Sequence, residues 1–165
     1  MKKDLWLFLL KLAFFSLALG LLWHFYLQTL YPHFLKPVAV PFFQWVGVKK
    51  WRLSLLLDHF SNLVPYTALV LATPGIIKEW KKTLLTFFGG LLILMIGHLL
   101  LSWADYYYWA KYGLTRGLFR NTFHFILLND ALPLGLWLLF YSRKLTGLFG
   151  FLKFGRKNRE NDGGD

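Results

Sequence analysis

The sequence predicts an all-α integral membrane protein, a four-helix transmembrane bundle with an aromatic, proline-containing outer loop. Hydrophobic residues make up 56% of the 165 positions and charged residues 16%, whereas soluble domains average about 45–50% and about 25%. Four long apolar segments follow one another along the chain, each near the roughly 20 residues that a helix needs to cross a bilayer. The basic residues gather in short runs beside these segments, which is typical of membrane topology rather than of a nucleic-acid site.

We expect a transmembrane domain over residues 1–144. Its first span is an uncleaved helix, because the apolar run is too long for the hydrophobic region of a signal peptide. At about 1.5 Å per residue, a span of this size reaches roughly 30 Å, the thickness of one hydrocarbon core. The four spans are expected at about residues 12–31, 55–77, 83–103 and 122–141.

The connections differ in composition from the spans. Residues 32–52 hold three prolines, which oppose a continuous helix, so we expect a loop on the outer side. Its aromatic part, residues 38–48, either rests on the lipid headgroups or re-enters the membrane. Residues 105–121 form a second outer loop. Residues 145–165 form a cytoplasmic basic tail with a disordered end.

Lysine and arginine set the orientation. With the N-terminus inside, twelve of the nineteen basic residues lie on the cytoplasmic side, including the dense turn at residues 78–82. Because cytoplasmic loops carry the excess of positive charge, we expect both termini in the cytoplasm. The predicted location is the bacterial inner membrane, where membrane lipids surround the spans and no nucleic acid is bound.

The second span carries a polar stripe. On a 3.6-residue period, Asn62, Tyr66, Leu69 and Thr73 share one face. Lipid does not satisfy polar groups, so we expect neighbouring helices to pack on this face. Pro65 predicts a bend just before it, and the Thr-Pro-Gly sequence that follows predicts that the helix either ends or bends there.

The last span, like the second, has polar residues just before a proline. Asn129 and Asp130 precede Pro133, whose ring leaves the carbonyl of Asn129 without its helical donor. A carboxylate near the middle of a bilayer costs roughly 2.5–3.5 kcal/mol on insertion scales, so Asp130 needs a proton or a partner. Because Asn62 likewise lies a few residues before a proline, Pro65, we predict that the two kinked helices are direct neighbours.

The other polar side chains favour the outer half of the membrane, whereas the inner half is almost purely Leu, Phe, Ile and Gly. Three interpretations stay open: hydrogen bonds that fix the bundle, a surface for a membrane partner or lipid-linked substrate, and a haem, metal or quinone site. Candidates for the cofactor site are His24, His98 and His124, although no ligand motif such as HExxH occurs. The candidate partner surface comprises His59, Asn62, Pro65, Tyr66, His98, Asp105, His124, Asn129, Asp130 and Pro133.

Catalysis is not expected. A hydrolase or transpeptidase needs a nucleophile beside a base, and the chain has neither a GxSxG elbow nor a cysteine. His98, Ser102 and Asp105 fall on one helix face, but three residues along one helix rarely reach the geometry of a triad. The lack of cysteine also excludes disulfides and thiolate metal sites. We therefore expect neither enzymatic activity nor a resident cofactor.

Residues 62–74 read NLVPYTALVLATP. Together with the basic turn at residues 78–82 and the ALPL segment at residues 131–134, this run resembles the exosortase H-associated family of small membrane proteins. The resemblance covers about residues 53–141, and the first helix matches only in its general character, not in its sequence. It implies an inner-membrane accessory to a system that processes C-terminal sorting signals at the outer face. Exosortases use a membrane-embedded cysteine with Arg and His, so no catalytic residue carries over to this chain.

The prediction is therefore a non-enzymatic accessory protein whose partner is an exosortase-like integral membrane protein. The alternative is a small membrane subunit that binds haem, metal or quinone through the outer-half histidines.

Overall fold

The computed structural model describes residues 2–48, 57–112 and 116–145, so the predicted tail lies outside the described residues beyond its first position. Over these residues the chain forms helices joined by short turns, with no strand. The predicted all-α fold is confirmed. The helices are α1 (Lys2–Leu22), the π-helix η1 (Trp23–Leu27), α2 (Gln28–Trp45), the 3₁₀-helix η2 (Leu57–Asn62), α3 (Leu63–Ala72), the 3₁₀-helix η3 (Ile77–Glu79), α4 (Trp80–Tyr112) and α5 (Arg116–Leu145).

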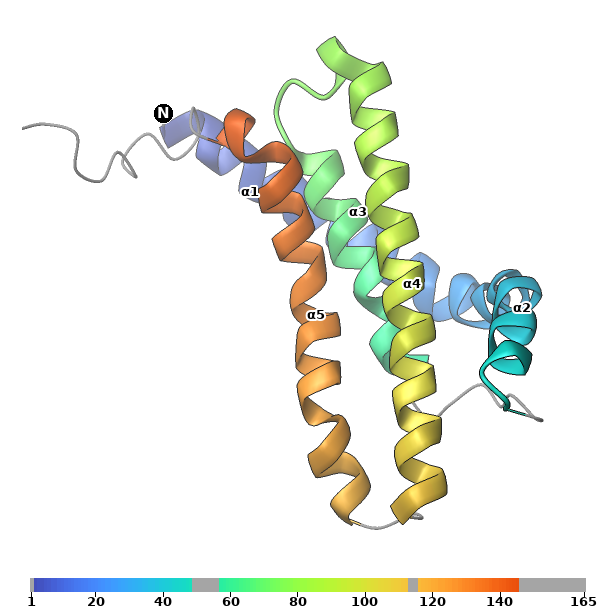
Figure 1. Cartoon of the computed structure of the whole chain (residues 1–165). Coiled ribbons are helices and arrows are strands. Elements are labelled where there is room, and N and C mark those ends of the chain that lie inside the picture. Colours follow the sequence, from blue (N-terminus) through green and yellow to red (C-terminus); the bar gives the residue numbers. More distant parts are fainter. Residues whose placement is uncertain (1, 49–56, 113–115, 146–165) are drawn as a thin grey trace, which may run out of the picture.

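Three helical stretches are long and apolar enough to cross a membrane, namely Lys3–Trp45, Trp80–Tyr108 and Phe123–Ser142. They indicate a multi-pass membrane protein. The predicted second span, residues 55–77, holds a shorter apolar helix, Phe60–Ala72. α4 and α5 run antiparallel with α3 between them, α1 crosses behind α3 at a steep angle, and α2 lies beside α4 (Figure 1).

The outer loop predicted for residues 32–52 is wrong over its described part. α2 remains helical through Pro32, Pro37 and Pro41. Each proline removes one backbone hydrogen bond, but an unwound segment in apolar surroundings would leave many more backbone groups without partners. The helix is therefore the less costly conformation here. Residues 49–52 lie outside the described residues.

The second predicted loop, residues 105–121, is also largely helical. α4 continues to Tyr112 and α5 begins at Arg116, and the connection at residues 113–115 lies outside the described residues. With 33 residues, α4 is about 50 Å long, whereas one hydrocarbon core needs about 30 Å. Composition marks where the apolar span ends, and the helix extends well beyond that point.

The predicted end of the second span is confirmed. α3 ends at Ala72, and Thr73 is extended with φ −62° and ψ 129°, as expected for the residue before Pro74. Gly75 follows with φ 72°, a left-handed conformation that glycine adopts readily. At the other end, Pro65 lies exposed in the first turn of α3, just after η2 passes into the α-helix. The bend predicted there coincides with this change of helix type.

Two groups of buried side chains form the interior. One joins α1, α3, α4 and α5, and in it Phe8 stacks on Trp137 with ring centres 5.8 Å apart. The other joins η1, α2, η2, α4 and α5. Only 6% of the most apolar window of Lys3–Trp45 is buried, against 28% in the corresponding windows of α4 and α5. Few side chains of this apolar window are therefore buried by the rest of the described structure, whereas Leu35, Ala39 and Phe43 further along the stretch are buried.

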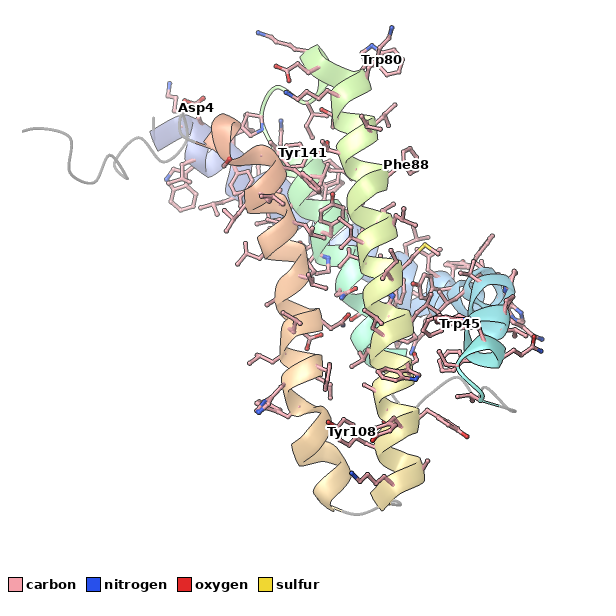
Figure 2. The ribbon with its side chains drawn as sticks, in the orientation of Figure 1. Asp4, Trp45, Trp80, Phe88, Tyr108 and Tyr141 are labelled. Atoms are coloured by element: carbon pink, nitrogen blue, oxygen red, sulfur yellow. The ribbon has the colours of Figure 1, made fainter. Side chains whose placement is uncertain are left out.

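α4 has an outward side and a packed side. Phe88 projects outward from it (Figure 2). On the packed side, the ring of Tyr66 is completely buried against Gly90, and a Cβ at Gly90 would overlap both this ring and its hydroxyl. At Gly89 a Cβ would meet nothing within 4 Å. Close packing of α3 on α4 thus requires glycine at position 90 only.

Gly90→Ala should therefore destabilise the fold by about 1–3 kcal/mol, because the added methyl displaces a buried ring. The matched control is Gly89→Ala, which should be neutral or slightly stabilising because alanine favours the helix over glycine. Thermal unfolding of the detergent-solubilised variants, followed by circular dichroism, measures the difference. Equal midpoints for the two variants would contradict the packing of Tyr66 on α4.

Candidate functional site

A series of buried hydrogen bonds links four helical elements. The Tyr31 hydroxyl in α2 contacts Nδ1 of His98 in α4 at 2.5 Å, and Nε2 of His98 contacts Oδ1 of Asn62 in η2 at 2.7 Å. Asn62 donates from Nδ2 to the backbone carbonyl of Asn129 in α5 at 3.0 Å. Asn62, His98 and Asn129 are each at most 5% exposed. We call these four residues the polar chain.

The partners fix the direction of each hydrogen bond. The carbonyl of Asn129 only accepts, so the amide nitrogen of Asn62 faces it and the amide oxygen faces His98. That oxygen also only accepts, so Nε2 of His98 carries the proton. Nδ1 of the neutral ring then accepts from Tyr31. Donation runs in one direction from α2 to α5, and hydrogen bonds in such a series polarise and strengthen one another.

The acceptor at the end of the polar chain is available because of a proline. In a regular helix the carbonyl of Asn129 would accept from the N–H of residue 133, which is the buried Pro133. Asn62 supplies the missing donor from another helix. The predicted contact between these two helices is confirmed. Asp130 lies outside the polar chain: its side chain is exposed and accepts from Nδ2 of Asn129 at 3.4 Å.

Aromatic rings enclose His98. Phe60 stacks on the imidazole with ring centres 4.5 Å apart and an interplanar angle of 27°. Tyr31 meets it edge-on, with centres 5.5 Å apart, and Trp23 lies next to Tyr31 at 5.6 Å. The imidazole has no exposed surface. These rings keep water away from the polar chain, and low local polarity strengthens its hydrogen bonds.

A second layer of hydrogen bonds lies further along α3. Tyr66 donates to the carbonyl of Thr86 in α4 at 3.1 Å, and the hydroxyls of Thr86 and Tyr141 in α5 are 2.9 Å apart. Trp137 donates from Nε1 to Oγ1 of Thr73 at 2.8 Å. The polar stripe predicted on the second span is therefore confirmed as a buried, hydrogen-bonded face.

Among the described residues, hydrogen-bonding residues that were not predicted from the sequence include Tyr31, Thr86, Trp137 and Tyr141. The last three are polar exceptions in the half of the protein that composition predicts to be almost purely Leu, Phe, Ile and Gly. The sequence does contain a signal for such residues, because a buried tyrosine or tryptophan usually has a hydrogen-bond partner. Tyr66, on the predicted stripe, required an acceptor from a neighbouring helix.

The candidate cofactor-binding histidines do not converge. Both ring nitrogens of His98 are engaged in the polar chain. The side chains of His24 in η1 and His124 in α5 are exposed. Among the described residues, no group of three or more His, Cys, Asp or Glu side chains is arranged to hold a metal ion. The side chain of His59 lies outside the described residues.

The triad-like stripe on α4 is not assembled. The ring nitrogens of His98 face Tyr31 and Asn62 rather than Ser102. Ser102 is buried and Asp105 half-buried on the same helix. The polar chain therefore has the geometry of a connection between helices, in which both ring nitrogens of His98 are engaged.

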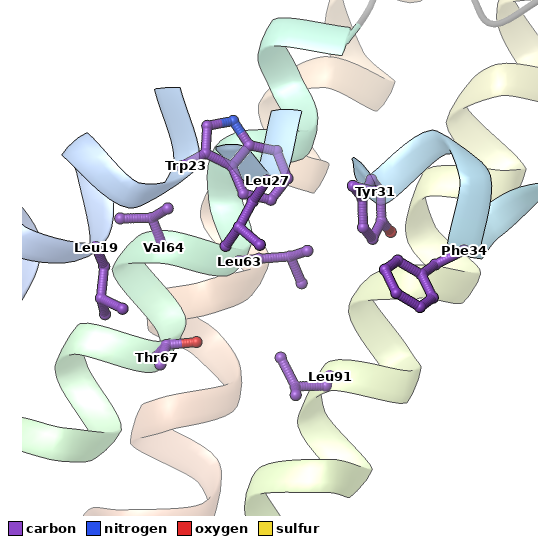
Figure 3. A pocket seen from close by; sticks show the side chains of 9 residues that line it. All are labelled: Leu19, Trp23, Leu27, Tyr31, Phe34, Leu63, Val64, Thr67 and Leu91. Carbon is purple, nitrogen blue, oxygen red and sulfur yellow. The ribbon is translucent and has the colours of Figure 1, made fainter. Parts of the chain in front are cut away.

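An apolar pocket of about 210 Å³ lies beside the polar chain. Its walls come from α1, η1, α2, α3 and α4, and Tyr31 belongs both to the pocket and to the polar chain (Figure 3). The lining is almost entirely hydrocarbon, and Thr67 contributes a hydroxyl to it.

The fold and this site define an all-helical, multi-pass membrane protein whose helices are joined by buried hydrogen bonds. Comparison with known protein families, with curated proteins and with solved structures finds no match.

The role of Pro133 can be tested with Asn62. Asn62→Leu removes the donor to the Asn129 carbonyl and should destabilise the protein by about 1–2 kcal/mol. Pro133→Ala restores a backbone N–H that can bond the same carbonyl, so Asn62→Leu should cost at least about 0.5 kcal/mol less in that background. Unfolding of the four proteins in detergent gives this coupling energy.

Strict additivity of the two changes would show that Asn62 does not depend on the carbonyl freed by Pro133. His124→Leu serves as the control, because this exposed side chain of α5 lies outside the polar chain and should leave stability within about 0.5 kcal/mol.

Proposed function

We propose that this chain is a non-enzymatic accessory protein of the bacterial inner membrane, which binds a membrane-embedded protein-sorting enzyme of the exosortase type. The observation that carries the proposal is the bare surface of its first helical stretch. Only 6% of the most apolar window of Lys3–Trp45 is buried, although this stretch holds about a quarter of the chain. A partner helix would cover it.

The composition of this surface favours a protein partner. Its exposed side chains include Trp6, Phe14 and Phe25, and aromatic residues are enriched where proteins meet. The rest of the protein does not require this surface for its own packing, because α3, α4 and α5 contact one another directly. A helix that is attached on one side and bare on the other is suited to bridging two membrane proteins.

The state of the polar side chains supports an accessory rather than an enzyme. His98, the buried histidine, has both ring nitrogens bonded within the chain. His24 and His124 lie on exposed surfaces of different helices, which disfavours a shared cofactor. The run that carries the family resemblance, residues 62–74, forms the central helix, where Asn62 and Tyr66 bond its neighbours.

The proposal includes four crossings with both termini on the cytoplasmic side. η2 and α3 together cover Leu57–Ala72, and their combined rise of about 27 Å is close to one hydrocarbon core. Phe8 near the N-terminus stacks on Trp137 near the end of α5, which supports a common side for the two ends. The basic turn that contains Lys78 supports the cytoplasm as that side.

Photo-crosslinking tests the proposal. Benzoylphenylalanine replaces Phe14 or Phe25 on the first stretch, and Phe88 or Phe125 on α4 and α5 serve as controls, since all four side chains are exposed. The chain is co-expressed with a cysteine-containing exosortase-type enzyme and irradiated in membranes. We expect adducts with that enzyme from positions 14 and 25 and few from positions 88 and 125, because the bare stretch forms the interface.

Two results would contradict the proposal. One is an absence of adducts from the first stretch while the two proteins are both present in the membrane. The other is a stoichiometric haem or metal in the purified chain, which would instead support the cofactor-binding alternative.

A further inference from the structure

The apolar pocket beside the polar chain has the properties of a lipid site. Its volume is about 210 Å³, larger than the roughly 150 Å³ of an engineered apolar cavity that binds benzene. We propose that it holds part of one acyl chain of a membrane phospholipid. This assignment does not depend on the partner proposed above.

The mouth of the pocket opens where lipid is present. Phe34 at its rim is 71% exposed. Phe34 belongs to Lys3–Trp45 and the lining residue Leu91 belongs to Trp80–Tyr108, two of the stretches long and apolar enough to cross a membrane. The pocket is therefore continuous with a surface that faces hydrocarbon, and an acyl chain enters it without leaving the bilayer.

The backbone of the first stretch is shaped around the pocket. Leu19, Trp23, Leu27 and Tyr31 all line it at intervals of four residues. In an α-helix each such step drifts by about 40° around the axis, so three steps would carry the last side chain away. The π-helix η1, at Trp23–Leu27, has a wider turn that offsets this drift, and π-helical turns occur frequently at functional sites.

The pocket is also preformed. Tyr31 is held by its hydrogen bond to His98, and Trp23 packs against Tyr31 with ring centres 5.6 Å apart. The opposite wall consists of Val64 and Thr67 on α3, which the polar chain and the second layer fix to α4 and α5. A rigid wall of aromatic and aliphatic groups forms many van der Waals contacts with a hydrocarbon chain.

The lining favours the acyl chain over a polar headgroup. None of the described residues that line the pocket is basic, whereas phosphate recognition uses Arg, Lys or several N–H donors. The Tyr31 hydroxyl is engaged with His98. Of the nine side chains drawn around the pocket, Thr67 points a hydroxyl toward the interior (Figure 3).

The test measures the lipid that stays with the full-length protein. The chain is purified in a mild detergent, and native mass spectrometry with lipid extraction counts bound phospholipid. We expect about one phospholipid per chain in the unmodified protein. Thr67→Phe fills the pocket and should lose it, whereas Thr67→Val keeps the shape, removes the hydroxyl and should retain it.

Leu91→Phe fills the pocket from the α4 wall and should lose the lipid too, which covers the case in which Thr67→Phe fails to fold. Leu92→Phe is the matched control, because Leu92 is next to Leu91 in sequence but is exposed and does not line the pocket, and this variant should retain the lipid. Loss of the ligand in Thr67→Val would show recognition of a polar group and overturn the assignment. Recovery of an isoprenoid lipid, or of no lipid at all, would also overturn it.

Discussion

The hydrogen bond from Nδ2 of Asn62 to the carbonyl of Asn129 is the constraint on which the arrangement of the helices depends. In an apolar medium there is no water to satisfy a backbone carbonyl that has lost its helical donor. Pro133 creates such a carbonyl inside α5, and the side chain of Asn62 satisfies it. Because Asn62 also accepts from His98, the same residue joins η2, which leads into α3, to α4 and α5 at one point.

Some helices of this protein are held together by hydrogen bonds and others by apolar contacts. α3, α4 and α5 are joined by hydrogen bonds in two layers, at His98 and at Thr86. α1 is attached through apolar contacts such as the stack of Phe8 on Trp137. In lipid, apolar contact between helices has no hydrophobic driving force, since lipid tails are equally apolar. α1 is therefore the helix whose contacts a partner or a lipid can most readily replace.

The sequence was most informative where chemistry is local. The buried stripe on α3, its end at Thr73 and the contact between the helices of Asn62 and Pro133 all follow from periodicity and from the missing N–H of proline. It was least informative about helix ends. The prolines of α2 suggest a loop by the rules that hold in water, but surroundings without water favour the helix even when single hydrogen bonds are lost.

The candidate site shows the same limit. Asn62, His98 and Asn129 were named among the polar residues of the candidate partner surface, but Tyr31 was not, because it lies at the predicted end of the first span, next to the segment assigned to a loop. Its place beside His98 depends on the π-helical turn of η1 and on helical structure continuing into α2, and neither is visible in the periodicity. Asp130 was given weight for its charge, although the interaction that matters is made by the backbone of the residue before it.

An acceptor on the backbone also fixes register. A side chain can follow a sliding helix, but the carbonyl of Asn129 is the one that Pro133 releases, and its neighbours in α5 remain bonded within the helix. Asn62 can therefore satisfy it in only one axial position of α3. Polar residues in helix interfaces are known to set register in this way. Through His98 and Tyr31 the same register reaches α2, which places the walls of the apolar pocket and the bare face of the first stretch.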